Sequence, residues 1–182
     1  MKKITLIFVS LMFVCACSKE AQELAYANQD KQIETYINAV LKADETAKVV
    51  YNDGVARVIA HGSEEGEGEA LNSRGTVTFE YAAYDFSKSS LSASSFISTN
   101  RAELANSLGF SVSDKTLFKP VTLDLSGDTM LEGLRLGLAG VKKNQVATIL
   151  FSGKYGFGDT YNGTVKRNSP LAYQVWILDI LN

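Results

Sequence analysis

The sequence predicts a single α+β domain, and three observations carry this prediction. Apolar residues recur at helical spacing just before residue 42, as Ile33, Tyr36, Ile37, Val40 and Leu41. The segments 76–81 and 121–125 alternate between apolar and polar residues with the period of two that is typical of strands. A short apolar run at 130–138 predicts one buried helix. No repeat and no second core is evident, and about 165 residues after the N-terminal segment suit one domain.

The elements are expected in the following order. A helix over residues 30–41 is expected to dock on its own domain, with dimerisation as the alternative. Residues 100–103 resemble a capping box that opens a short helix ending at Gly109. Asp128 is placed to cap the helix at 130–138. Strands are expected at 55–60, 76–81, 121–125, 146–151 and 170–177.

The first sixteen residues predict a targeting segment that is not part of the fold. Two lysines precede an apolar stretch at 4–14, which is too short for an ordinary membrane-spanning helix. The sequence Val14-Cys15-Ala16-Cys17 then resembles the lipobox of bacterial lipoproteins, which implies cleavage before Cys17 and lipidation of that residue. An ordinary secretory signal is the alternative. We therefore expect a signal peptide at 1–16, a lipidated Cys17 with a polar tether and the amphipathic helix at 17–48, and the globular domain at 49–182.

Charge and residue types exclude several classes of function. The 18 basic and 20 acidic residues give a net charge of −2, which leaves no basic face for nucleic acid. A single histidine, His61, leaves no set of three histidines for a catalytic zinc, and no HExxH motif exists. A Ser–His–Asp triad would have to use the same residue, which lies beside a glycine-rich acidic run at 62–69. That run is typical of a solvated hairpin loop, so we expect no metal. The pair Gly153-Lys154 lacks the upstream glycine of a P-loop, and no cofactor is expected.

Rotation about a prolyl peptide bond is chemistry that needs no proton shuttle. Its barrier of about 18–20 kcal/mol arises from resonance in the planar amide. A dry aromatic pocket solvates the planar, charge-separated form poorly and can bind the twisted form better. Such a pocket needs aromatic walls, an aliphatic floor and one or two hydrogen-bond donors.

The order of motifs from residue 77 to residue 180 resembles the FKBP-type peptidyl-prolyl isomerases. The tyrosine-bearing strand of the family matches 78–81, and its Phe-Asp-Ser-Ser stretch matches 96–99. The Val-Ile pair and the following helix match 130–141, and the Tyr-Gly loop matches 155–158. The closing Leu-x-Phe strand matches Leu171-Ala172-Tyr173.

The resemblance implies a fold and a site. The fold is α+β, a twisted antiparallel sheet half-wrapped around one short helix, preceded by the N-terminal amphipathic helix and carrying an inserted helix within an insertion at about 87–119. The pocket implied by the family is formed by Tyr81, Phe96, Ile97, Val121, Met130, Leu131, Leu134, Phe157, Val165 and Tyr173.

The sequence departs from the family at polar positions of this pocket. Ile97 stands where the family has an aspartate, and Phe157 stands where a tyrosine donates to the ligand carbonyl. Leu134 replaces the tryptophan of the pocket floor. Because one such hydrogen bond contributes about 0.5–1.5 kcal/mol, these losses predict weak isomerase activity. A non-catalytic FKBP-fold module that binds peptides as a chaperone, or a scaffold lipoprotein, is the alternative.

The resemblance and the lipobox together imply partners and a location. We expect proline-containing polypeptides as substrates, a membrane contacted through the lipid anchor, no nucleic acid and a monomeric state. The domain is expected in the cell envelope, in the periplasm or at the cell surface. The absence of an aspartate directly after Cys17 favours the outer membrane.

Overall fold

The computed structural model describes residues 3–59, 66–110 and 118–182, with side chains from residue 19 onward. His61, residues 62–65 of the acidic run and the Cys17 side chain lie outside the described residues and side chains.

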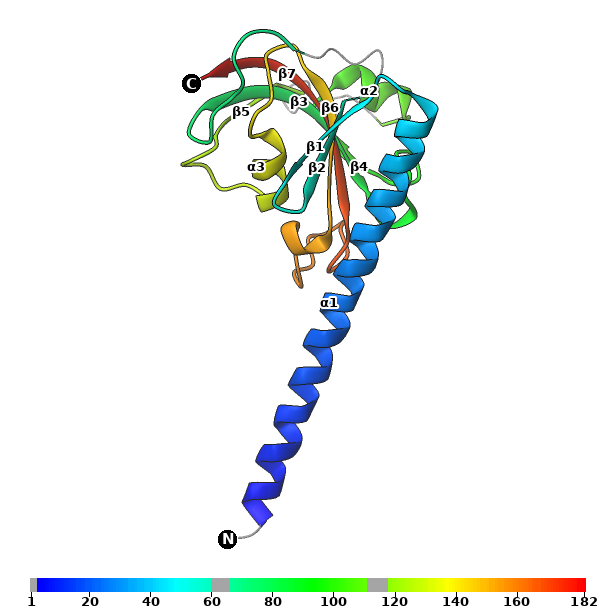
Figure 1. Ribbon diagram of the computed structural model, residues 1–182, viewed down its shortest axis with the longest axis vertical. Coiled ribbons are helices and arrows are strands. Elements are labelled where there is room, and N and C mark those ends of the chain that lie inside the picture. Colours follow the sequence, from blue (N-terminus) through cyan, green and yellow to red (C-terminus); the bar gives the residue numbers. More distant parts are fainter. Residues whose placement is uncertain (1–2, 60–65, 111–117) are drawn as a thin grey trace.

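Seven antiparallel strands form one sheet in the order β1-β2-β6-β7-β3-β4, with β5 also paired to β3 (Figure 1). Outside the long N-terminal helix α1, Lys3–Ala43, the described residues form two short α-helices and two 3-10 turns. The strands are β1 Lys48–Asn52, β2 Val55–Ile59, β3 Thr76–Asp85, β4 Phe96–Thr99, β5 Val121–Asp124, β6 Val146–Phe151 and β7 Leu171–Leu181. The helices are α2 Ala102–Ser107 and α3 Glu132–Leu138, and the 3-10 turns are η1 Phe86–Lys88 and η3 Gly153–Tyr155.

The sheet has two buried faces because side chains alternate along its strands. The face toward α3 holds the larger core, which we call the first cluster and which includes Val77, Phe79, Ile149 and Val175. The opposite face is covered by α1 and holds the second cluster, which includes Ile33, Ile37 and Leu150. A twisted antiparallel sheet packed around one short helix is the α+β fold that the sequence predicts, and this prediction is confirmed.

Helix α1 docks on its own domain, as the sequence predicts. Tyr26, Ile33 and Ile37 are buried along one stripe of the helix, and Tyr36 packs edge-on against Phe86 with ring centroids 5.2 Å apart. The helix is longer than predicted, because the segment 18–28 that was expected to be a polar tether continues it. Tyr26 lies within that segment and explains the difference, since its ring is only 7% exposed. No helix in the part of the chain that the structure describes is long and apolar enough to cross a membrane.

Three local features differ from the sequence-based predictions. The strand β1 was not predicted, although Asp53-Gly54 forms a two-residue turn with positive φ values of 45° and 85°, which is typical of a hairpin. The capping-box prediction for α2 is wrong, because Arg101 is the N-cap residue and makes no side-chain cap. Leu131 is the N-cap residue of α3, and Asp128 instead accepts a hydrogen bond from the backbone of Asp124 at 2.8 Å.

Candidate functional site

An aromatic surface lies on the α3 face of the sheet. The rings of Tyr81 and Tyr173 are 6.0 Å apart between centroids, on the neighbouring strands β3 and β7. Phe151 of β6 stacks on Tyr173 with centroids 5.9 Å apart and an interplanar angle of 13°. Phe151 is fully buried, whereas both tyrosines are half-buried. The three strands thus place two half-buried phenol rings beside the fully buried ring of Phe151, which we call the aromatic floor.

Nine of the ten predicted pocket residues belong to the first cluster or pack against it. Leu134 and Val165 are buried members of the first cluster, and the other seven are half-buried and pack against it. The nine residues are Tyr81, Ile97, Val121, Met130, Leu131, Leu134, Phe157, Val165 and Tyr173.

Phe96 is the residue that the structure does not bring to this face. It packs against the second cluster, where its ring centroid lies 5.8 Å from that of Tyr84 and 5.0 Å from that of Phe110. Its neighbour Ile97 packs against the first cluster instead. Successive side chains of a strand point to opposite faces, so Phe96 and Ile97 of β4 cannot share one face of the sheet.

The hydroxyl of Tyr173 stays protonated over a wide range of pH. Burial, followed by the neighbouring Tyr81, raises the pKa of Tyr173 to about 12. A phenol that does not ionise remains a hydrogen-bond donor. The site therefore has a neutral donor on an apolar surface, and no set of His, Cys, Asp or Glu side chains among the described residues is grouped to hold a metal.

Helix α3 approaches the aromatic floor closely because of two glycines. A Cβ on Gly133 would lie 2.3 Å from the ring of Phe151, and one on Gly137 would lie 2.1 Å from Ile149. Both distances are far below van der Waals contact, so the backbone of α3 rests directly on β6. This close approach places Leu131 and Leu134 beside the aromatic side chains.

Arg57 of β2 holds the C-terminal end of α3. Its Nη1 donates to the carbonyls of Gly137 and Ala139 at 2.9 and 2.7 Å, and its Nη2 donates to Gly140 at 3.1 Å. The side chain is 6% exposed, and this burial lowers the pKa of the guanidinium. A cation at a helix C-terminus meets carbonyl groups that have no partner within the helix. Arg57 thereby fixes α3 against the sheet.

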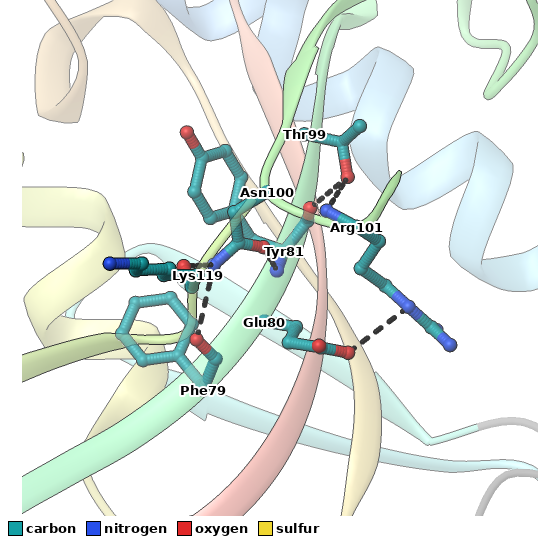
Figure 2. Close-up of polar contacts among 7 residues, drawn as sticks. All are labelled: Phe79, Glu80, Tyr81, Thr99, Asn100, Arg101 and Lys119. Atoms are coloured by element: carbon teal, nitrogen blue, oxygen red, sulfur yellow. Dashed lines mark hydrogen bonds and ion pairs between the residues drawn. The ribbon is translucent and has the colours of Figure 1, made fainter. Parts of the chain in front are cut away.

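Asn100 completes the hydrogen bonding of the strand that carries Tyr81. β4 pairs with residues 82–84 of β3 and β5 pairs with residues 76–79, so no strand among the described residues pairs with residues 80 and 81 on this side of β3. The buried Asn100 amide accepts from the Tyr81 backbone N–H at 2.7 Å and donates to the carbonyl of Lys119 at 2.9 Å (Figure 2). Thr99 donates to the Tyr81 carbonyl at 2.5 Å. Side chains therefore fix the backbone of Tyr81 on the side of β3 that does not face β7.

The side chain of Glu80, also on β3, lies on the opposite side of the sheet from Tyr81. Figure 2 shows the rings of Phe79 and Tyr81 on one side of β3 and Glu80 on the other, facing Arg101. Arg101 pairs with Glu80 at 3.1 Å, and its guanidinium lies 4.1 Å from the centre of the Trp176 ring. These contacts hold the start of the α2 segment away from the aromatic surface.

Gln29 of α1 closes the loop that carries Phe157 and Val165. Its Oε1 accepts from the Gly153 backbone N–H at 2.8 Å, and its Nε2 donates to the Asn168 carbonyl at 2.7 Å. Asn168 adopts a left-handed φ of 56°, and its side-chain oxygen accepts from Tyr26 at 2.5 Å. One side chain of the docked helix thus joins the two ends of the loop.

Sequence reasoning missed the residues that support this site. Phe151 was placed only as part of a strand, and Arg57, Asn100 and Gln29 were not singled out for these contacts. Their partners are backbone groups far away in the sequence, and no local pattern marks such contacts. The close packing of Gly133 and Gly137, four residues apart on one helix face, is the signal that could have been used.

One family profile matches part of the chain. The sequence profile of the FKBP-type peptidyl-prolyl cis-trans isomerases matches residues 102–178, less than half of the chain. No curated protein sequence matches the chain significantly. The profile match thus covers part of the domain, from the start of α2 into β7.

Solved structures of low sequence identity share the fold. The N-terminal domain of FKBP42 from Arabidopsis thaliana is 20% identical with a TM-score of 0.54, over 76% of this chain and 94% of that one. FkpA from Escherichia coli is 16% identical with a TM-score of 0.53, over 99% of this chain and 73% of that one. A peptidyl-prolyl cis-trans isomerase from Pseudomonas syringae is 14% identical with a TM-score of 0.55, over 88% of this chain and 96% of that one.

Proposed function

We propose that this chain is an FKBP-type peptidyl-prolyl cis-trans isomerase that acts on proline-containing segments of exported proteins. The observation that carries the proposal is the aromatic surface of Tyr81 and Tyr173 over Phe151, with Leu131 and Leu134 of α3 beside it. The match of residues 102–178 to the family supports isomerase chemistry in general.

The proposed mechanism uses the apolar surface and its phenol groups. An X–Pro amide that leaves water loses solvation of its planar, charge-separated form, so the twisted form is bound better. The proline ring would pack against the aromatic floor while a hydroxyl donates to a carbonyl of the substrate. No side chain has to accept or release a proton in this reaction.

Tyr173 supplies the hydrogen-bond donor that the family carries at another position of the pocket. Phe157 has no hydroxyl at the loop position, and Ile97 has no carboxylate, so both polar groups implied by the resemblance are missing. Tyr173 stands where the family's closing strand has phenylalanine, and its pKa near 12 keeps its hydroxyl protonated. We place the donor on β7 rather than on the loop.

We infer the site of action from the N-terminal sequence. The lipobox supports lipidation of Cys17, an outer-membrane anchor and a domain that works in the periplasm or at the cell surface. The docking of α1 on its own domain supports a monomer, because the stripe that could have joined two chains is buried within one.

A protease-coupled prolyl peptide assay on the mature chain tests the isomerase proposal. We expect catalysis above the uncatalysed rate, a fall of about tenfold in kcat/KM for Tyr173→Phe, and a gain for Phe157→Tyr. Tyr84→Phe is the matched control, because Tyr84 is a buried tyrosine of the opposite face. A wild-type rate equal to the uncatalysed rate, with no gain in a Phe157→Tyr, Ile97→Asp double variant, would refute isomerase activity.

A binding module without catalysis is the second candidate function. Ile97 and Phe157 favour it, because they keep the apolar surface and lose the polar groups. Peptide titration followed by NMR distinguishes the candidates. A binding module shifts the signals of Tyr81 and Tyr173 without accelerating isomerisation, whereas a scaffold protein does neither.

A further inference from the structure

The docked part of α1 begins very close to the proposed lipid anchor. Gln22 is the first residue of the helix with a described contact to the domain, since its Nε2 donates to Asn168 Oδ1 at 2.9 Å. Cys17 lies five positions earlier in the same continuous helix. A helix rises about 1.5 Å per residue, so the anchor and this contact are separated by about 7.5 Å along the axis.

The part of the domain at this contact is the loop between Gly153 and Asn168. Figure 1 shows this orange segment at the end of the domain where α1 leaves it. Gln22, Tyr26 and Gln29 all bond to Asn168, so the loop is fixed beside the helix rather than free to swing away. A membrane that holds the start of α1 therefore faces this loop.

The exposed side chains of the loop suit a negatively charged interface. Lys154, Lys166 and Arg167 are exposed and Asp159 is the one acid of residues 153–168, which gives +2 in a chain whose net charge is −2. Tyr161 is 62% exposed. Tyrosine and basic side chains are enriched where proteins meet anionic lipid head groups.

Other charges nearby limit the attraction. Arg167 also pairs with Asp159 at 3.7 Å. The adjacent turn of α1 carries Lys19, Glu20 and Glu23, which together contribute −1. The potential of a membrane surface decays over about 8 Å at physiological ionic strength, and this length matches the separation of about 7.5 Å. Because α1 is helical in this segment, the contact between Gln22 and Asn168 at the end of the loop stays at about this distance from the anchor along the helix axis.

We propose that the exposed loop of residues 154–167 contacts the anionic head groups of the membrane that anchors Cys17. The proposal rests on the lipidation of Cys17 and is independent of isomerase activity. It implies that the same loop that carries Phe157 and Val165 works at the membrane surface, so substrates are bound there rather than in free solution.

The test uses the chemistry of the mature chain itself. Cys17 is the only cysteine after cleavage at the lipobox, so the chain from residue 17 can be coupled to a maleimide lipid. Vesicles of phosphatidylcholine, with or without a minority of phosphatidylglycerol, carry the coupled chain. Chymotrypsin cleavage after Tyr161 is compared with cleavage after Tyr51, which is 55% exposed and lies on β1.

On vesicles with phosphatidylglycerol, we expect cleavage after Tyr161 to be at least about fivefold slower than in the uncoupled chain. Cleavage after Tyr51 should change less than about twofold. A Lys154→Gln, Lys166→Gln, Arg167→Gln variant, or vesicles of phosphatidylcholine alone, should restore most of the rate after Tyr161.

Four results would overturn the proposal. Cleavage after Tyr161 at the uncoupled rate on charged vesicles contradicts the contact. Equal protection of both tyrosines indicates general shielding, and protection that survives the triple substitution indicates proximity without head-group binding. A mature N-terminus without acyl groups in the native host removes the anchor, whereas loss of prolyl isomerase activity would leave every one of these readouts unchanged.

Discussion

Gln29→Ala removes the side chain that joins the two ends of the Gly153–Asn168 loop. The substitution deletes one hydrogen bond of 2.8 Å from Gly153 and one of 2.7 Å to Asn168. Each bond contributes about 1 kcal/mol net, and a donor left unsatisfied costs about 1–3 kcal/mol. Gly153 is buried, so its N–H lacks easy access to water. We therefore expect the free energy of unfolding to fall by about 2–3 kcal/mol.

The same change should also affect the site, because Phe157 and Val165 lie within the loop. We expect kcat/KM in the prolyl peptide assay to fall by about threefold to tenfold while the protein remains folded. Urea unfolding gives the stability, and the assay is run at a urea-free condition where the variant is fully native.

Gln32→Ala is the matched control for this prediction. Gln32 lies on the same helix, and its Nε2 donates to the carbonyls of Phe86 and Ser87 at 3.0 Å each, away from the Phe157 loop. Its loss should lower stability and leave kcat/KM unchanged. Equal loss of activity in both variants, or a Gln29→Ala protein within about 0.5 kcal/mol of wild type, would refute the loop-closing role.

Three further predictions concern the packing and the ionisation of the site. Gly133→Ala should lower the free energy of unfolding by about 1–3 kcal/mol in urea, because its Cβ would lie 2.3 Å from the Phe151 ring and this clash outweighs the better helix propensity of alanine. Arg57→Met should cost about 3 kcal/mol by the same measurement, since three carbonyls lose a charged donor, and an unchanged midpoint would contradict this role. The raised pKa of Tyr173 contributes to the stability of the folded state fully below pH 10, and this contribution is lost as the pH rises toward 12. The free energy of unfolding should therefore fall by about 2 kcal/mol more in wild type than in Tyr173→Phe between pH 9 and about pH 12.

Local patterns predicted the elements whose side chains alternate over a buried face. The strand β6 was predicted with its observed bounds, 146–151, and the period of two at Val77, Phe79 and Tyr81 places these residues in or against the first cluster, as expected. The β1 strand was missed because its apolar residues do not alternate with polar ones: Val50 and Tyr51 follow each other on opposite faces of an edge strand, and both are exposed.

Contacts between distant segments could not be predicted in this way. In the sequence, Asn100 lies beside a helix start and resembles an N-cap residue. In the structure its amide instead bonds to the backbone N–H of Tyr81, on the side of β3 where residues 80 and 81 lack a described partner strand, and to the carbonyl of Lys119. The same reasoning applies to Phe96, which the family motif places in the pocket. Strand geometry turns it to the opposite face and leaves Ile97 on the site side.

The choice between isomerase and binding module depends on where the donor hydroxyl lies. A loop tyrosine at position 157 would hold its hydroxyl on a segment whose position depends on α1 through Gln29. Tyr173 instead projects from the middle of the sheet, from a strand paired on both sides and stacked on a fully buried ring. A donor held this rigidly loses little conformational entropy when a substrate binds, which favours the twisted amide if the geometry fits. The absence of a hydroxyl at position 157 therefore does not by itself argue against catalysis. The effect of Tyr173→Phe on kcat/KM is the measurement that separates the two functions.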